Sequence, residues 1–187
     1  MPEWMMINCI EIDPFTKGGA YVVGTKYKSG DYLPYIYKTE NYGKSWRQIT
    51  NGIGAEDFTR ALRADPKRKG LLYAGTERGM YISFDDGTSW NKFQLNLPVV
   101  PITDLAIKND NLIAATQGRS FWMIDDLTPL HQLTSSLVKE NIVLFKRSFL
   151  KNNIFFKNDR FVFRIFFVIL KTKRSFLKKR RTIHPYA

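Results

Sequence analysis

An eight-residue pattern occurs twice at a fixed offset, and it constrains the fold of this chain more than any other feature. The copies run from Thr39 to Trp46 (TENYGKSW) and from Ser83 to Trp90 (SFDDGTSW), so equivalent residues lie 44 positions apart. A period in the forties is typical of repeat proteins in which each repeat is one supersecondary unit. The pattern therefore predicts an array of similar units.

Each copy has the composition of a tight β-hairpin. The side-chain oxygen at the third position, Asn41 or Asp85, can accept hydrogen bonds from nearby backbone amides, and Gly at the fifth position tolerates a positive φ. Trp at the eighth position supplies a large apolar anchor where the next strand begins. We therefore assign structural roles to Thr39, Asn41, Gly43, Trp46, Ser83, Asp85, Gly87 and Trp90.

The segments around the hairpins repeat as well. AYVVGT ending at Thr25, LLYAGT ending at Thr76 and NLIAAT ending at Thr116 are three copies of one strand. Each unit has the pattern of four short strands, rich in Val, Ile, Tyr and Thr and separated by Gly and Asp-Pro. Four-stranded units of this length are the blades of a β-propeller. We expect an all-β fold, a partial β-propeller of about three antiparallel four-stranded blades at about residues 6–50, 57–94 and 101–133.

The third hairpin is degenerate. Asp125 and Asp126 correspond to the acidic pair of the second copy, but Leu127 replaces the Gly and Leu130 replaces the Trp. We still place this segment at the end of a third blade.

These motifs resemble the Asp-box (BNR-repeat) β-propellers, which include sialidases, xyloglucan-cleaving glycosidases, photosystem assembly factors and sortilin-type receptors. The resemblance is greatest to bacterial glycosyl-hydrolase-like and sortilin-like propeller proteins and covers about residues 2–145. The stretches that carry it are PYIYKTENYGKSW, DPKRKGLLYAGTERGMYISFDDGTSW and GRSFWMIDDLTPL. The hairpin motif is specific for the fold and says little about activity, because one fold hosts many functions.

Composition separates the chain into two unlike parts. Residues 1–137 hold 15 basic and 15 acidic residues, whereas residues 138–187 hold 14 basic and 2 acidic ones, so the formal charge of +12 belongs to the last 50 residues. Those 50 contain nine of the 14 Phe and neither Gly nor Trp. We expect residues 1–137 to form the partial propeller and residues 138–187 to be a basic Phe/Lys-rich tail that is not a folded domain.

Three interpretations of this tail stay open. Phe and Lys/Arg together suit single-stranded nucleic acid, and they also suit an anionic membrane surface. The third interpretation, which we favour, is an unselected sequence of the kind that AT-rich DNA gives when read out of frame. It predicts no specific nucleic-acid partner and only non-specific binding of anions. The ten apolar-rich residues Phe161–Leu170 are too few for a transmembrane helix of about 20 residues.

The two ends of the sequence lead to two further expectations. A signal peptide has a basic segment, then an apolar segment, then a cleavage site. The first 14 residues, MPEWMMINCIEIDP, do not show this pattern. This gives a cytoplasmic location by default, although the proteins that the chain resembles are typically exported, so the location stays open. Three blades cannot close a ring that needs about four or more, and we therefore expect a fragment of a larger propeller protein.

Residues that carry metal or cofactor chemistry are sparse. Cys9 is the one cysteine, and the two histidines are His131 and His184, so neither a zinc-ligand set nor a Ser-His-Asp set can be assembled. The sequence also lacks a phosphate-binding Gly loop. We expect no metal and no cofactor.

A ligand site is expected on the face opposite the hairpins. In a blade, the loop between the second and third strands and the connection to the next blade emerge there, and in proteins that this chain resembles that face holds the substrate or peptide. The first such loop, residues 26–34, is about seven residues longer than its counterpart, because the Gly-Thr pairs are 51 apart and the hairpins 44. Extra length there is a mild functional signal, although an ordinary surface loop remains the alternative.

Side chains in these loops suit a carbohydrate or a peptide. Tyrosines offer flat faces to sugar rings, carboxylates accept hydroxyl groups, and arginines bind acidic groups or, alternatively, pair with neighbouring acids. The predicted ligand-face residues are Tyr27, Asp31, Tyr32, Glu77, Arg78 and Arg119.

Two classes of function therefore stay open. In the first, the chain is a fragment of a sialidase-like or sortilin-like propeller that binds a glycan or a peptide and is inactive alone. In the second, it is part of a glycoside hydrolase whose catalytic carboxylates lie partly in blades outside this sequence. Such an enzyme needs two carboxyls about 5–10 Å apart, one with a raised pKa. Asp31 and Glu77 are the catalytic candidates, and no motif marks them as a pair.

Overall fold

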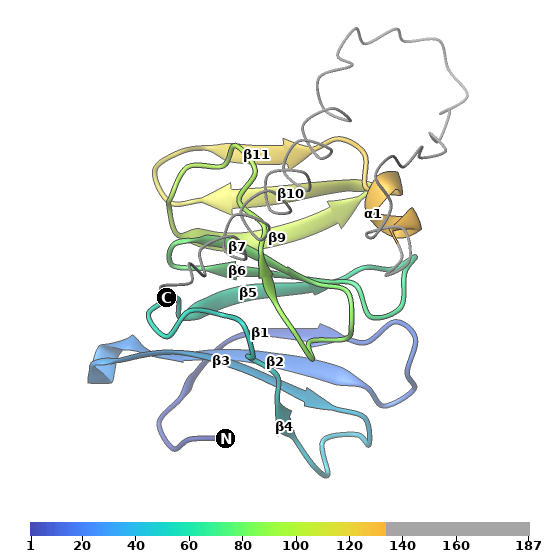
Figure 1. Cartoon of the computed structure of the whole chain (residues 1–187). Coiled ribbons are helices and arrows are strands. Elements are labelled where there is room, and N and C mark those ends of the chain that lie inside the picture. Colours follow the sequence, from blue (N-terminus) through green and yellow to red (C-terminus); the bar gives the residue numbers. More distant parts are fainter. Residues whose placement is uncertain (134–187) are drawn as a thin grey trace, which may run out of the picture. The chain divides into compact units, whose positions relative to one another are not determined.

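The computed structural model describes residues 1–133. Within them the chain forms three antiparallel sheets that follow one another in sequence (Figure 1). The first sheet contains β1 (Met6–Ile12), β2 (Ala20–Lys26), β3 (Asp31–Thr39) and β4 (Arg47–Gln48), in that order. The second contains β5 (Thr59–Ala64), β6 (Leu72–Thr76), β7 (Gly79–Ser83) and β8 (Asn91–Lys92). The third contains β9 (Ile102–Lys108), β10 (Asn111–Thr116) and β11 (Phe121–Ile124).

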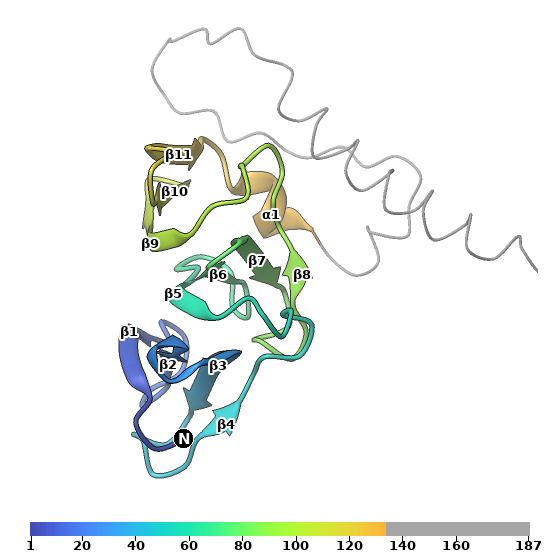
Figure 2. The same ribbon diagram turned by 90° about the vertical axis from the view of Figure 1, so that its left-hand side faces the viewer.

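The three sheets stack face to face. In Figure 2 the first strands β1, β5 and β9 lie along one edge of the stack, and β4 and β8 lie along the other. Two apolar clusters fill the spaces between sheets. Residues such as Val23, Ile36, Leu62 and Trp90 form the first cluster between the first two sheets. The second cluster lies between the second and third sheets.

Burial in the second sheet explains its sequence. All five residues of β6 and all five of β7 are buried, because this sheet is covered on both faces. A strand buried on both faces is expected to be continuously apolar rather than alternating. Gly75 of β6 lies close to the third sheet, where an added Cβ would come within 2.7 Å of Ile102 Cγ2. A small residue is therefore required at this point of the repeated Gly-Thr pair.

The partial all-β propeller predicted from the repeats is confirmed. Within residues 1–133, helix is confined to a single 3-10 turn, Tyr27–Ser29, and to α1 (Thr128–Gln132). Neither helix is long and apolar enough to cross a membrane.

The third sheet differs from the first two in its last part. It has three strands among the described residues, and α1 replaces the hairpin that joins the third and fourth strands elsewhere. The local sequence explains this, because Leu127 stands where the other hairpins use Gly at φ 81° and 79°. Pro129 in the first turn favours a helix, and Asp126 Oδ1 accepts a hydrogen bond of 2.8 Å from the Thr128 amide.

The predicted boundary at residue 137 and the predicted basic tail, residues 138–187, lie outside the described residues.

Candidate ligand-binding face

The hairpin end of each sheet is closed by contacts with the loop between its first two strands. The amide of Tyr42 donates to the Gly18 carbonyl, that of Asp86 to the Gly70 carbonyl, and that of Leu127 to the Asp110 carbonyl, each at 2.9 Å. The same contact thus recurs in all three sheets, even though the third has a helix there. These backbone amides and carbonyls at the hairpin end are therefore engaged in hydrogen bonds within their own sheet.

The polar residues of the repeated pattern lie within the two turns. Thr39 Oγ1 accepts a hydrogen bond from the Gly43 amide at 3.0 Å, and Ser83 Oγ accepts one from the Gly87 amide at 2.9 Å. Asn41 Oδ1 and Asp85 Oδ1 each accept the amide four residues further along at 2.9 Å. These side chains satisfy turn amides that would otherwise lack a partner.

Asp85 shows the electrostatic effect of this arrangement. Partial burial raises the pKa of its carboxyl, but hydrogen bonds from Ser89 and Ser83 outweigh the burial and bring the pKa below its ordinary value. The carboxylate form is therefore the one that the turn stabilises.

The two tryptophans of the pattern lie in different surroundings. Trp90 is 4% exposed and packs in the first cluster, and its indole Nε1 donates to the Ile49 carbonyl at 2.8 Å. Trp46 occupies the same position in the first sheet but is only half-buried. Trp90 rests on the preceding sheet, and none of the described residues forms a sheet before the first one.

A buried cation joins the first two sheets at the hairpin end, and sequence reasoning missed it. The Lys38 side chain is 2% exposed, and its ammonium contacts carboxylates of Asp86, Glu40 (2.6 Å) and Asp13 (3.9 Å). Tyr21 Oη donates to the other oxygen of Asp86 at 2.6 Å. Burial lowers the pKa of the Lys38 ammonium, but Asp86 and Glu40 raise it more, so the pKa lies above its ordinary value. The available signal was a lysine inside the apolar run PYIYKT.

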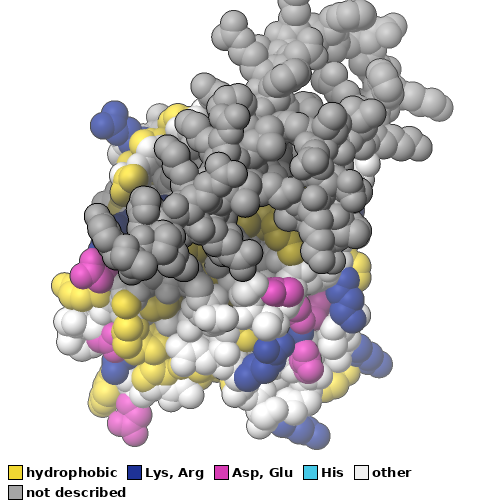
Figure 3. Space-filling view, viewed as in Figure 1, with side chains coloured by type: hydrophobic (Ala, Val, Ile, Leu, Met, Phe, Trp, Pro, Cys, Tyr) yellow, Lys and Arg dark blue, Asp and Glu magenta, His cyan; other side chains and the backbone are white. Residues whose placement is uncertain are grey.

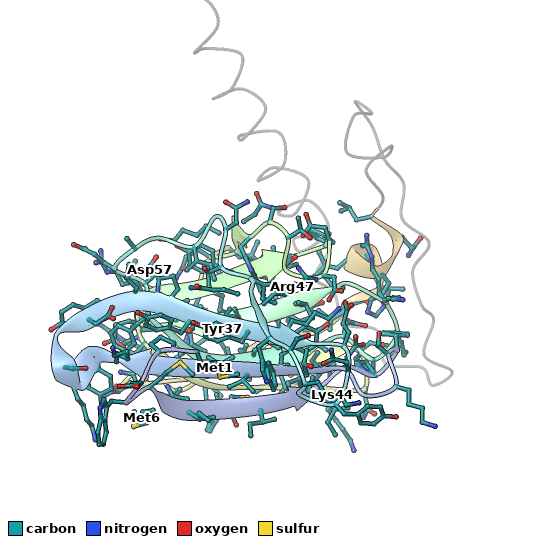
Figure 4. The ribbon with its side chains drawn as sticks, turned by 90° about the horizontal axis from the view of Figure 1, so that it is seen from below. Met1, Met6, Tyr37, Lys44, Arg47 and Asp57 are labelled. Atoms are coloured by element: carbon teal, nitrogen blue, oxygen red, sulfur yellow. The ribbon has the colours of Figure 1, made fainter. Side chains whose placement is uncertain are left out.

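The opposite end carries the predicted ligand-face residues. Figure 4 shows that Asp57 and Lys44 lie toward opposite ends of the first sheet, with Tyr37 of β3 between them. On the side of Asp57, the connection between the first two sheets meets the long β2–β3 loop. This loop end of the first two sheets is called the loop face below.

Three aromatic rings meet on the loop face. Tyr27 stacks on Phe58 with ring centroids 5.3 Å apart and ring planes 14° apart, and Tyr32 lies 6.1 Å from the same ring. The guanidinium of Arg60 lies 5.1 Å from the Phe58 ring centre, at the distance of a cation–π contact. Phe58 is buried, whereas Tyr32 is 51% exposed. The sequence analysis did not single out Phe58, because its role depends on contact with a loop about 30 residues away.

Asp31 is held as an anion by its neighbours. Its Oδ2 accepts a hydrogen bond of 2.6 Å from Tyr35 Oη, and its Oδ1 accepts one of 3.0 Å from the Leu33 amide. The Tyr35 hydroxyl and then the Leu33 amide lower the pKa of the Asp31 carboxyl, and Asp31 raises the pKa of Tyr35 to about 12. A general acid of a glycosidase needs the opposite shift.

The other acidic residues of the loop face are ion-paired. Glu77 Oε2 lies 2.6 Å from Arg60 Nη2, and the Glu77 amide donates to the Phe58 carbonyl at 3.1 Å. Arg78 contacts Glu56, and its Nε lies 3.4 Å from Asp57 Oδ1. The Glu77 pair ties the β6–β7 turn to β5, and the Arg78 pairs tie it to the connection before β5.

Arg119 lies apart from this group in the turn between β10 and β11. Its side chain is exposed, and its carbonyl accepts a hydrogen bond of 2.9 Å from Trp122 Nε1. Five of the six predicted ligand-face residues therefore take part in the contacts of the first two sheets, and Arg119 belongs to the third.

Charge on the described surface is mixed. In Figure 3 basic and acidic side chains are interspersed on the visible face. Among residues 1–133, no group of three or more His, Cys, Asp and Glu side chains is arranged to hold a metal ion.

Solved structures that are similar to this chain share little sequence identity with it. No protein-family model matches it, and no curated protein matches its sequence. Similar solved structures include a GH74 enzyme from Niastella koreensis, with 14% identity and a TM-score of 0.49 over 64% of this chain and 21% of that one. YCF48 bound to D1 peptide has 19% identity and a TM-score of 0.46 over 64% and 36%. The GH74 xyloglucanase from Xanthomonas campestris has 16% identity and a TM-score of 0.46 over 64% and 22%. The chain thus matches well under half the length of each.

Proposed function

We propose that residues 1–133 are part of an Asp-box propeller that binds a glycan or a peptide on the loop face and performs no catalysis alone. The observation that carries the proposal is the aromatic group of Tyr27, Phe58 and Tyr32. Tyr27 fixes the long loop against Phe58, and Tyr32 beside them remains half exposed. A partly exposed aromatic ring held on a fixed loop offers a flat apolar surface at a small entropic cost.

Polar groups around this surface suit orientation of a ligand. Asp31 is an anion beside the aromatic group and can accept hydroxyl or amide hydrogens. Arg78 is half exposed and already shared between Glu56 and Asp57, so an acidic ligand group would compete with these two carboxylates for it. A mainly apolar surface with a few convergent polar groups is the usual form of a small-ligand site.

Binding accounts for these groups better than catalysis does. Asp31 has a lowered pKa, and Glu77 is paired with Arg60, so neither resembles a carboxylic acid poised to donate a proton. A glycoside hydrolase parent remains the alternative, and it requires carboxyls contributed by blades outside this sequence.

The proposal is tested with glycan and peptide arrays, followed by titration calorimetry of any ligand found. Tyr32→Ala should weaken binding about tenfold or more, equivalent to about 1.4 kcal/mol. Tyr42→Ala is the matched control, since Tyr42 is 70% exposed at the hairpin end. Equal losses in both variants, or the absence of any glycan or peptide ligand, would contradict the proposal.

A further inference from the structure

The connection between the first two sheets contains a chemically labile dipeptide, Asn51-Gly52, which occurs once in the sequence. In an Asn-Gly pair the backbone nitrogen of Gly can attack the side-chain amide carbon of Asn, because Gly has no Cβ to obstruct the approach. The equivalent residues of the second repeat, 44 positions further on, are Leu95 and Asn96. The repeat itself therefore does not require the labile pair, which belongs to the contact between the first two sheets, called the joint below.

Both residues of the pair are built into the joint. The Asn51 carbonyl accepts a hydrogen bond from the Trp90 amide at 2.9 Å, and the Asn51 side-chain Nδ2 donates to the Thr88 carbonyl at 3.2 Å. Gly52 has φ 98°, and an added Cβ would clash with the Trp90 carbonyl oxygen. The close approach of the second sheet therefore requires Gly at this position, and two hydrogen bonds to that sheet hold Asn51.

The same two hydrogen bonds restrain the reaction. Asn51 and Gly52 are exposed, so water reaches the pair in the folded chain. The Gly52 nitrogen meets the Asn51 amide carbon only in a limited range of side-chain and backbone torsion angles. The bond to Thr88 restricts the side chain, and the bond to Trp90 restricts the backbone. Opening of the joint releases both.

We propose that Asn51 is a site of spontaneous deamidation and that the joint controls its rate. The Gly52 nitrogen forms a bond to the Asn51 amide carbon, and ammonia leaves with the Gly52 amide proton, which gives a cyclic succinimide. Water then adds to either carbonyl of the succinimide and breaks the ring C–N bond, which gives aspartate or isoaspartate. The net change consumes one water and releases one ammonia, and it needs neither an oxidant nor a reductant.

The products no longer fit the joint. In aspartate an oxygen replaces Nδ2, so a hydrogen-bond acceptor faces the Thr88 carbonyl where a donor lay before. In isoaspartate the main chain runs through Cβ and Cγ, and the carbonyl that accepted the Trp90 amide becomes a free carboxylate. Deamidation therefore weakens the contact between the first two sheets.

The test measures deamidation in the full chain by peptide mapping with mass spectrometry, which separates the unmodified Asn51 peptide from its aspartate and isoaspartate forms. Samples are incubated in mildly alkaline buffer with and without denaturing urea. Conversion in the folded chain should be slower than in urea by about tenfold or more, because the open joint is the reactive form. Equal rates in the two conditions, or no conversion in urea, would overturn the proposal.

Two tryptophan variants show whether this joint is responsible. Trp90→Phe removes the indole hydrogen bond to the Ile49 carbonyl and should speed conversion of the folded chain about threefold or more. Trp46→Phe changes the equivalent residue of the first sheet, away from the joint, and should leave the rate unchanged. Circular dichroism before incubation establishes that each variant is folded. Equal rates in the two variants would also overturn the proposal.

A third variant imitates one product directly. Asn51→Asp should lower the melting temperature by about 3 °C, because it places a carboxylate beside the Thr88 carbonyl. Asn91→Asp is the matched control, since it makes the same change at an exposed position of β8 and should leave the melting temperature unchanged. Equal melting temperatures for the two variants would overturn the weakening of the joint.

Discussion

Replacement of Trp90 by Ala is expected to cost far more stability than replacement of Trp46, although the two residues occupy the same position of the repeat. Trp90 is 4% exposed between the first two sheets, and Trp46 is half-buried. The difference arises because Trp90 packs on Ile49 at the end of the preceding sheet. Among the described residues no sheet precedes the first one, so Trp46 has no such neighbour.

The magnitude can be worked from the contacts. A buried aromatic side chain removes about 150–250 Å² from water, which at about 25 cal/mol per Å² gives about 4–6 kcal/mol, and the Cβ that Ala retains lowers the loss somewhat. The indole also donates to the Ile49 carbonyl at 2.8 Å, and losing that bond leaves a buried acceptor without its partner. Trp90→Ala should therefore cost about 3–5 kcal/mol, and Trp46→Ala less than about 2 kcal/mol.

The assay is urea unfolding followed by far-UV circular dichroism, because both variants alter tryptophan fluorescence. With a slope of about 2 kcal/mol per M, Trp90→Ala should lower the midpoint by about 2 M at unchanged slope. Trp90→Phe keeps most of the apolar volume and should lie between Trp90→Ala and the unmodified chain. If Trp46→Ala lowered the midpoint as much as Trp90→Ala, the account of stacking between sheets would be wrong.

Three further changes test the hairpin end. Gly87→Ala should destabilise by about 1 kcal/mol more than Gly43→Ala, since both have φ near 80° but only at Gly87 would a Cβ lie 2.5 Å from Ile49; urea midpoints of the two variants give the comparison. Lys38→Met should cost about 3 kcal/mol by leaving Asp86 without its cation, and the double variant with Asp86→Asn should cost less than the sum of the single changes. The lowered pKa of Asp85 gives stability that is complete above the unfolded pKa, near 3.8, and is lost as pH falls through the folded pKa. In the Asp85→Asn variant, the free energy of unfolding should therefore fall less steeply as the pH is lowered through the acidic range. An unchanged pH dependence would show that this carboxylate contributes nothing.

The sequence was sufficient for features that depend on local chemistry. The turn at Tyr42 and Gly43 requires only residues within the hairpin, and its copy lies 44 residues further on, so the repeat predicts it directly. The same logic explains the third sheet, where Leu127 removes the tolerance for positive φ that the hairpin requires. The sequence pattern showed the loss of Gly there, but it did not predict that Asp126 and Pro129 would start a helix instead.

Contacts between side chains of different sheets could not be predicted from the sequence. Lys38 meets Asp86, and Tyr27 meets Phe58, across separations of 48 and 31 residues. No period in the sequence marks these pairs, because each side chain is unremarkable within its own repeat. The lengthened loop did indicate where contacts of this kind gather, and the ion pairs of Glu77 and Arg78 lie at the same end.

Hydrogen-exchange mass spectrometry with a ligand from the arrays tests the proposed binding face most directly. The account predicts that the ligand slows exchange in residues 26–34, 54–60 and 77–79 of the loop face. It predicts no change in residues 16–19, 40–46 and 84–90, whose amides serve the hairpin end. Protection confined to the hairpin end would contradict the account, and the aromatic group around Phe58 would then be structural.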